Sequence, residues 1–266
     1  MNAHSSPIVV FDLDGTLAET EDLHRQAFNR AFAELGLPWH WDEALYADLL
    51  TVMGGKERLA HYIDTQHAPE AKALRGLSPE IHARKTVAYG ALVAEIGLPL
   101  RPGIARLIAE AQAAGIRLAV ATTTSRPNVD RLLAANFPPD AALFDVIAAG
   151  DEAKRKKPAP DVFLLALAGL NVAASEAVAF EDSAAGISSA RAAGLPVLAT
   201  RSRYTDSHRL DGAFSAVSDL GEPDRPHRHI AGVAWPGGVV DLAGLIRWHE
   251  TLDGQSTPVQ AIGTNR

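Results

Sequence analysis

The sequence contains no cysteine, and this absence excludes several kinds of chemistry. Without thiols the chain cannot form disulfides, use a thiolate nucleophile, or hold zinc or an iron–sulfur cluster through cysteine ligands. Carboxylates and histidines are the metal ligands that remain. Any metal site in this chain must therefore be built from oxygen or imidazole ligands.

Long apolar runs and an excess of positive charge are also missing. No stretch reaches the ~18 consecutive apolar residues of a membrane-spanning helix, and residues 1–7 are polar, unlike a signal peptide. The net charge of -7 argues against nucleic acid or an anionic membrane as a partner. We therefore expect a cytoplasmic monomer, in which locally clustered cations would bind any small anionic ligand.

Apolar residues are abundant enough for a folded core, since 47% of the 266 residues are hydrophobic. This length supports one large or two modest domains, and no internal repeat or long low-complexity segment interrupts it. Residues 8–11, IVVF, are apolar and carry no charge. They predict a strand that is buried on both faces of a parallel sheet.

Two carboxylates stand at the carboxyl end of this predicted strand. Alternation along an extended chain sends Asp12 and Asp14 to the same side, and Gly15 permits a sharp turn off the sheet. Open α/β sheets bind ligands outside the carboxyl ends of their strands. Two acids this close need a shared proton or a cation, and their hard oxygen ligands favour Mg²⁺. The alternative is an Asp-rich turn that caps a helix.

Hydrophobic spacing along the rest of the chain predicts an α/β fold. The pattern after the first strand is helical until residue 118, so residues 19–97 are predicted to form an inserted helical cap. Strands and helices then alternate, which indicates a doubly wound parallel sheet with a Rossmann-like core. We expect this core in residues 1–18 and 98–220, and a C-terminal extension in 221–266 that packs on the core or trails from it. Predicted strands lie at 118–121, 146–148, 178–180 and 197–199, predicted helices at 19–35, 42–50, 56–66, from 78 onward, 103–114, 128–136, 160–168, 183–193 and 242–249, and a charged loop at 222–229.

Two further features lie at or near predicted strand ends. Hydroxyls at Thr122, Thr123 and Thr124 precede a helix start, where they either cradle an anion with the free N–H groups or serve as ordinary caps. Pro158 keeps Lys157 extended, so its ammonium can be fixed beside a phosphate. The alternative for Lys157 is a basic run on the solvated surface.

The last feature is a pair of acids, Glu181 and Asp182, which an apolar strand delivers to its carboxyl end. Ser183 follows them as the predicted cap of the next helix. Adjacent acids are a weak signal alone, but at this position they would supply further carboxylates to the same cation.

These features, in this order, resemble the four motifs of the haloacid dehalogenase-like phosphohydrolase superfamily, over roughly residues 8–200. The matching pieces are DLDGT, a Thr after the second strand, a Lys before Pro, and the ED pair. The resemblance implies a Mg²⁺-dependent phosphatase that acts through an aspartyl phosphate. By the same resemblance Asp12 is the nucleophile and Asp14 is the general acid and base. Thr122 would bind the transferred phosphoryl group, and Lys157 would neutralise its charge. The metal ligands would be Asp12, Asp14 and Asp182, with Glu181 in support.

The position of the cap between the first two motifs resembles the subclass of phosphoglycolate phosphatases, β-phosphoglucomutases and CbbY-type sugar phosphatases. In this region Thr20 and His24 share a helical face with apolar residues, and Lys85 lies in register with apolar positions of a long helix. The alternatives are a satisfied core histidine and a snorkelling lysine. We favour substrate contact for these three side chains and for Thr123 and Thr124.

The runs LAETEDLH, GGKERLAHY and EDSAAGISSARAAGLP are most similar to the CbbY type. That group, similar in bacteria and chloroplasts, removes a phosphate from xylulose-1,5-bisphosphate, an inhibitor of the Calvin-cycle enzyme Rubisco. Glu19 and Thr20, both expected to bind substrate, stand where mutases carry Asp followed by Ser or Thr, which disfavours a mutase. Lys56, Arg84 and Lys85 would hold the second phosphate of a bisphosphate.

Three alternatives remain open from the sequence: a β-phosphoglucomutase-like enzyme, a phosphoglycolate phosphatase and a non-catalytic sugar-phosphate-binding protein. Phosphoglycolate carries no second phosphate and would not need the cap cations. Loss of a motif aspartate would be the sign of a non-catalytic protein, and both Asp12 and Asp14 are present.

Overall fold

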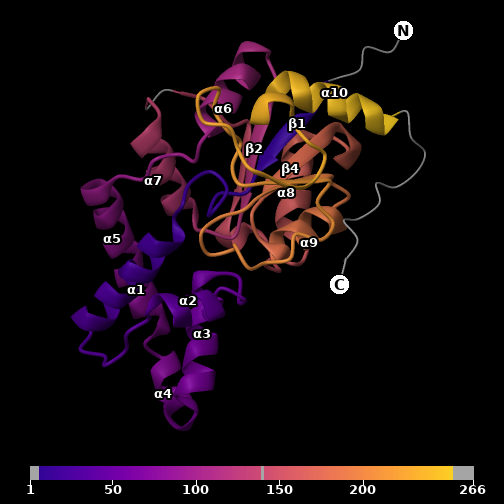
Figure 1. Ribbon diagram of the computed structural model, residues 1–266. Coiled ribbons are helices and arrows are strands. Elements are labelled where there is room, and N and C mark those ends of the chain that lie inside the picture. The colour runs from indigo at the N-terminus through magenta and orange to yellow at the C-terminus, as the bar shows by residue number, and fades with distance from the viewer. Residues whose placement is uncertain (1–5, 139–140, 254–266) are drawn as a thin grey trace.

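The computed structural model describes residues 6–138 and 141–253 (Figure 1), so predictions for residues 1–5 and 254–266 lie outside the described residues. Within these ranges the chain forms a seven-stranded sheet of order β3-β2-β1-β4-β5-β6-β7. All neighbouring strands are parallel except β7, which is antiparallel to β6. The strands are β1 Ile8–Phe11, β2 Leu118–Thr122, β3 Val146–Ala149, β4 Ala177–Glu181, β5 Val197–Thr200, β6 Ser215–Val217 and β7 His229–Gly232.

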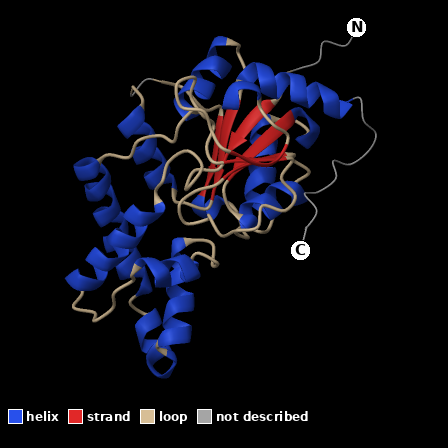
Figure 2. Ribbon diagram, viewed as in Figure 1, coloured by secondary structure: helices blue, strands red, loops and turns tan. Residues whose placement is uncertain are grey.

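Helices cover both faces of the sheet (Figure 2), which confirms the doubly wound α/β prediction. The side chains of Val9 and Phe11 join the apolar cluster on one face of β1, and those of Ile8 and Val10 join the cluster on the other. Burial on both faces is the reason that an uninterrupted apolar run forms this strand. The first cluster includes α6 (Ile104–Ala113), α7 (Arg126–Asn136) and α10 (Leu242–Asp253), and the second α8 (Asp161–Leu170) and α9 (Ala184–Ala192).

Between β1 and β2 the chain forms a helical insertion beside the sheet (Figure 1). It has its own aromatic core, which includes Phe28, Phe32 and Trp41. Leu23 and Tyr89 of the same insertion belong instead to the cluster on the sheet, so the insertion is also packed against the core. Its helices are α1 Glu21–Glu34, α2 Glu43–Leu49, α3 Gly55–Gln66, α4 Ala71–Arg75 and α5 Ser78–Ile96.

The predicted strands, and the predicted helices other than the last, agree with the structure to within two residues at each end; α10 continues to Asp253. The short helix α4 and the strands β6 and β7 were not predicted. Strand β7 begins at the last residue of the segment 222–229 that we expected to be a loop. Such short elements contain too few residues to display a hydrophobic period. In the described ranges, no helix is long and apolar enough to cross a membrane.

Candidate active site

The loop after β1 places two carboxylates in a cavity at the carboxyl end of the strand. Asp12 and Asp14 both line the cavity, whereas Leu13 between them is buried in the core. The chain turns at Gly15, whose φ of 79° lies in the left-handed region that favours glycine. A Cβ on Gly15 would also lie only 2.1 Å from Asp182 Oδ2. The turn therefore requires glycine for both its backbone and its lack of a side chain.

Asp12 belongs to a buried group of three acids and one lysine, which we call the floor of the cavity. Lys157 Nζ lies 2.5 Å from Asp12 Oδ1 and 2.5 Å from Glu181 Oε1. Oxygen atoms of the three carboxylates lie within 4.8 Å of one another. Adjacent parallel strands β1 and β4 end side by side, which explains why these acids meet. The floor consists of Asp12, Lys157, Glu181 and Asp182.

Glu181 is held by the start of α9. Its Oε2 accepts hydrogen bonds from the backbone N–H of Asp182 (3.1 Å) and from the N–H (3.3 Å) and hydroxyl (3.2 Å) of Ser183. A Cβ on Gly186 would lie 1.9 Å from Glu181 Cδ, so only glycine leaves room for the carboxylate. The first turn of a helix favours negative charge. The run FEDSAAG therefore folds as one unit that fixes Glu181.

The charges of the floor favour a bound cation. Burial, opposed by Lys157, raises the pKa of Asp12 to about 8. Burial and the charges of Glu181 and Asp12 raise the pKa of Asp182 well above its usual range. Burial opposes the charge on Lys157 as well, but Asp12 and Glu181 outweigh it and raise its pKa. A hard divalent cation would relieve the excess negative charge, and three carboxylates are suitable ligands for it.

Asp14 is bound from the side of the helical insertion. Thr20 Oγ1 donates to Asp14 Oδ1 at 2.5 Å, and His24 Nε2 lies 3.3 Å from the same oxygen. Burial favours the neutral carboxyl, but His24 and hydrogen bonds that include those of Thr20 and Thr124 outweigh it and hold the pKa of Asp14 well below its ordinary value. Among the described residues, the three-acid group does not include Asp14. The expectation that its carboxylate joins the other three is therefore not met by the geometry.

His24 connects Asp14 to Lys85. Lys85 Nζ lies 3.0 Å from His24 Nδ1, and an ammonium group only donates, so the neutral ring carries its proton on Nε2 and can donate to Asp14. Burial and Lys85 lower the pKa of His24, in agreement with a neutral ring. Burial also lowers the pKa of Lys85 to about 8. The ammonium lies over the rings of Phe28 and Tyr89, at 5.2 Å and 5.3 Å from their centroids.

The threonines after β2 divide between the cavity and the interior. Thr123 and Thr124 line the cavity. Thr122 is buried, and its Oγ1 accepts a hydrogen bond from the Thr124 N–H at 3.1 Å. Ser125 precedes α7, but its hydroxyl makes no cap hydrogen bond and has no partner in the described ranges. The start of α7 is therefore not capped by this side chain; the N–H groups of Asn128 (2.9 Å) and Val129 (3.2 Å) donate to the Ser125 carbonyl instead.

Four of the predicted substrate-binding residues do not line this cavity: Glu19, Thr20, Lys56 and Arg84. Arg84 lies on the outer side of α5, where its guanidinium pairs with Glu80 (2.7 Å) and Glu34 (3.6 Å) and its side chain is 41% exposed. This corrects the expectation that Arg84 faces a substrate: consecutive helix positions point about 100° apart, and Lys85 is the one that points inward. Glu19 Oε1 lies 3.2 Å from Arg101 Nε and lines a separate groove at the linkers.

Lys56 occupies an intermediate position. It lines a smaller cavity whose wall includes Lys85, Thr123 and Thr124, and these three residues also line the main cavity. Lys56 therefore lies at the rim shared by the two spaces.

Arg58 and Glu21, which were not predicted as site residues, line the cavity from the insertion. Arg58, on α3, is buried; its Nη1 donates to Tyr46 Oη at 2.9 Å and lies 4.0 Å from Glu21 Oε2. The signal that could have revealed it is its position four residues before the buried Tyr62, on an apolar helical face. We call the three buried basic side chains that the insertion presents to the cavity the roof: His24, Arg58 and Lys85.

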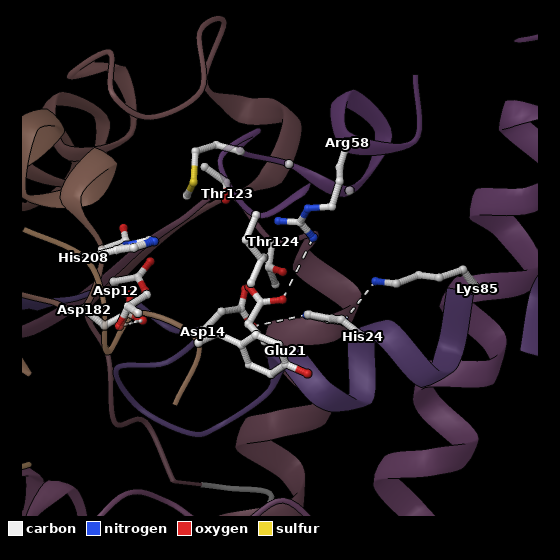
Figure 3. A pocket seen from close by; sticks show the side chains of 17 residues that line it. Asp12, Asp14, Glu21, His24, Arg58, Lys85, Thr123, Thr124, Asp182 and His208 are labelled. Carbon is white, nitrogen blue, oxygen red and sulfur yellow. Dashed lines mark hydrogen bonds and ion pairs between the residues drawn. The ribbon is translucent and has the colours of Figure 1, made fainter. Parts of the chain in front are cut away.

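The loop between β5 and β6 supplies a further wall that was also missed. Tyr204, Thr205 and His208 line the cavity. In Figure 3, His208 lies near Asp12, on the opposite side from Lys85. No motif or periodic pattern marks these loop positions in the sequence.

Comparison with known proteins gives consistent matches. The family model described as haloacid dehalogenase-like hydrolase matches residues 7–194. The plasmid-encoded protein CbbY of Cupriavidus necator is 47% identical over 248 residues, which cover 91% of this chain and 96% of the relative. CbbY of Cereibacter sphaeroides is 50% identical over 80% of this chain and 92% of the relative.

Solved structures give the same result. A mutant CbbY from Rhodobacter sphaeroides in complex with xylulose-1,5-bisphosphate is 49% identical, with a TM-score of 0.75 over 80% of this chain and 94% of that one. A β-phosphoglucomutase from Clostridium difficile has a TM-score of 0.66 at 22% identity, over 80% of this chain and 91% of that one. At that identity the second likeness concerns the fold alone.

Proposed function

We propose that this chain, which belongs to the haloacid dehalogenase-like hydrolase family, removes one phosphate from a sugar bisphosphate, with xylulose-1,5-bisphosphate as the substrate. Its phosphatase class follows from the family and the CbbY relatives. The observation that carries the substrate proposal is that Arg58 and Lys85, two buried cations, face the same cavity as Asp12. The xylulose-1,5-bisphosphate bound by a relative supports it.

In this proposal Asp12 is the nucleophile. A carboxylate oxygen forms a bond to phosphorus as the ester oxygen leaves, which gives an aspartyl phosphate. Lys157, 2.5 Å from Asp12 Oδ1, neutralises charge on the transferred group, and Thr123 and Thr124, which line the cavity, bind its oxygens. Thr122 supports this edge through its hydrogen bond with the Thr124 N–H.

Asp14 moves the protons. It gives a proton to the leaving oxygen and later takes one from the water that attacks the aspartyl phosphate, which releases phosphate and restores Asp12. Thr20 and His24 keep Asp14 ionised in the free protein, as its base role requires. An approaching phosphate dianion would raise the pKa of Asp14, so that it takes up the proton that it must donate.

We propose Mg²⁺ as the cation of the three-acid group. Asp12 and Asp182 line the cavity and would bind the ion, while Glu181, held by Lys157 and by the start of α9, would support them. Bound Mg²⁺ would screen the repulsion between these carboxylates and the phosphate.

The second phosphate would bind at the roof. A buried guanidinium such as Arg58 presents a planar fork to phosphate oxygens, and Lys85 adds an ammonium. Lys56 is a further candidate at the rim, whereas Arg84 is not, because its ion pairs lie outside. A small monophosphate bound at the floor would not reach the roof.

Kinetics on substrates of two sizes test this proposal. We expect Arg58→Gln to lower kcat/KM for xylulose-1,5-bisphosphate by about tenfold to hundredfold, since a hydrogen bond to a charged group is lost. Phosphoglycolate hydrolysis should change little, and the control Arg84→Gln should leave both substrates within about twofold. Equal losses for both substrates would contradict the proposal, as would a parent enzyme that prefers phosphoglycolate or isomerises a hexose phosphate.

Three expectations from the sequence stay predictions: the cytoplasmic location, the monomeric state, and the division of the chain into a core of residues 1–18 and 98–220, a cap of 19–97 and an extension of 221–266. Size-exclusion chromatography with light scattering checks the second of them.

A further inference from the structure

The loop between β5 and β6 contains a short segment, residues 202–205, that contacts the floor. Ser202 Oγ lies 2.7 Å and Thr205 Oγ1 3.2 Å from Asp182 Oδ2, and the two hydroxyl oxygens are 2.8 Å apart. Thr205 Oγ1 also accepts the Ser202 N–H at 3.1 Å. Both side chains are buried. Two linked hydroxyls therefore hold one oxygen of Asp182, and the absent side chain of Gly15 leaves the space that this oxygen fills.

The same segment contacts the helical insertion. Tyr204 Oη donates to Asp22 Oδ1 on α1 at 3.0 Å. The Tyr204 ring packs edge-on against Tyr46, with centroids 5.7 Å apart at 83°, and Tyr46 belongs to the aromatic core of the insertion. Arg203 adds an exposed ion pair with Glu43 at 2.6 Å, which in water contributes little. The two residues that contact the insertion, Arg203 and Tyr204, thus lie between the two buried hydroxyls of Ser202 and Thr205.

The base of this loop is fixed. The buried Arg101 donates from Nη2 to the carbonyl oxygens of Arg201 (2.6 Å) and Ser218 (2.7 Å), and from Nη1 to the carbonyl of Gly15. The Arg101 N–H donates to the carbonyl of Leu17 at 2.8 Å, at the linker that leads into α1. Because Arg201 is held, a displacement of Tyr204 by the insertion is not passed back into β5 and acts on the loop residues beside it, which include Ser202 and Thr205.

We propose that this segment couples the position of the insertion to the orientation of Asp182. Ser202 and Thr205 are the positioning residues for the carboxylate, and Tyr204 is the contact that follows the insertion through Asp22. The inference rests on the proposed function in one respect, that Asp182 binds the cation. Coupling between two sites is reciprocal, so the affinity of the floor for its cation depends on whether the roof is in place.

Titration of the full-length protein with Mg²⁺ alone, by isothermal calorimetry, tests this coupling. Thr205→Val removes one hydroxyl at constant shape and should weaken Mg²⁺ binding by about tenfold to hundredfold, as for other groups that orient a metal ligand. Thr205→Ser should restore the affinity. Tyr204→Phe keeps the ring and the net charge and removes only the hydroxyl that bonds Asp22; it should weaken Mg²⁺ binding several-fold.

The double variant separates coupling from independent effects. Tyr204→Phe combined with Thr205→Val should bind Mg²⁺ about as weakly as Thr205→Val alone, because the effect of Tyr204 passes through Thr205. Arg209→Ala, on the same loop but paired with Asp211 on the surface, is the control and should bind Mg²⁺ like the parent. Circular dichroism and Tm establish that each variant folds, and Ser202→Ala, which removes the other hydroxyl on Asp182, takes the place of Thr205→Val if that variant does not fold.

Each contrary result has a defined meaning. Parent-like Mg²⁺ affinity in Tyr204→Phe would overturn the coupling. So would a loss of Mg²⁺ affinity in the double variant that equals the product of the losses in the two single variants. Parent-like affinity in both Thr205→Val and Ser202→Ala would overturn the positioning role. A parent that binds no Mg²⁺ overturns the metal proposal together with this one. A parent that binds Mg²⁺ but does not hydrolyse xylulose-1,5-bisphosphate contradicts the substrate proposal alone.

Discussion

The floor and the roof of the cavity differ in the sign of the charge that they bury and in what holds it. The floor gathers three acids around one ammonium group, and the backbone places these acids at two adjacent strand ends and one helix start, where hydroxyls and N–H groups bind them. The roof presents basic groups that side chains mainly hold: the Tyr46 hydroxyl, the rings of Phe28 and Tyr89, and each other, with one backbone contact from Arg58 Nε to the Leu49 carbonyl. A geometry set by the backbone suits chemistry that every substrate requires. A geometry set by side-chain packing suits recognition of one substrate.

The largest expected effect tests the floor. Asp12→Asn keeps the shape of the side chain but removes the nucleophile, so kcat should fall by at least about 10³-fold for every substrate. The fold should survive, because burial already disfavours charge on Asp12. Phosphate release and Tm measure the two parts. Trapping of labelled phosphate on Asp12 of the parent checks the mechanism, and label found only elsewhere would contradict it.

Removal of the cation should be nearly as severe for any substrate. The three acids of the floor repel one another without a cation, so exhaustive treatment with EDTA should abolish phosphate release and added Mg²⁺ should restore it. Full activity after chelation, with the metal content checked by mass spectrometry, would show that the floor does not use a cation.

Loss of the ammonium group should damage the stability of the floor. Lys157→Met leaves Asp12 and Glu181 without the buried partner that lies 2.5 Å from each, which should cost about 3 to 5 kcal/mol of unfolding free energy. Lys154→Met, in the same basic run but exposed, is the matched control and should be close to neutral. Urea unfolding measures both, and equal midpoints for the two variants would remove the distinction between them.

The roof should show a pH dependence that the floor lysine does not share. Lys85 has a pKa of about 8 in the folded protein against 10.5 in the unfolded chain. Between these pH values the unfolded state binds more protons, so the Lys85 contribution to stability rises with pH. The stability of Lys85→Met relative to the parent should therefore decline by roughly 3 kcal/mol across this window. A pH-independent difference would mean that Lys85 is not desolvated.

The smallest effect is expected at Arg84, the residue before Lys85. Arg84→Gln removes a half-exposed guanidinium whose ion pairs lie outside the cavity, so kcat/KM should stay within about twofold for every substrate. A loss of kcat/KM for bisphosphates alone would mean that the outer side of α5 also contributes to binding of the second phosphate.

The floor could be predicted from the sequence because each of its acids stands at the carboxyl end of a buried strand. Side chains alternate strictly along a strand, and parallel strands end at one edge, so Asp12, Glu181 and Asp182 had to converge. Lys157 was predicted from its place before a proline. The contacts of Asp14 with Thr20 and His24 were not predicted as such, since they depend on how α1 leaves the turn at the end of β1.

The roof could be predicted only in part. His24 and Lys85 were expected from polar residues within apolar helical stripes, and both line the cavity. Arg84 was expected only as a further cation for the second phosphate, and it lies outside the cavity, because the count of cations does not show which of two neighbours faces inward until the packing of α1 against α5 is known. Arg58 was not predicted, since a buried arginine in a stripe looks like a surface residue until its partners Tyr46 and Glu21 are in place.

The sequence by itself determined the fold class, the order of the longer helices and of strands β1 to β5, and the acids at the strand ends, because these depend on hydrophobic period and chain direction, which are local properties. Only the tertiary structure decided which cations reach the cavity and that a loop after β5 joins Asp182 to the insertion. Those contacts bring together residues from distant parts of the chain, and their geometry depends on the packing of whole helices, which no local pattern records.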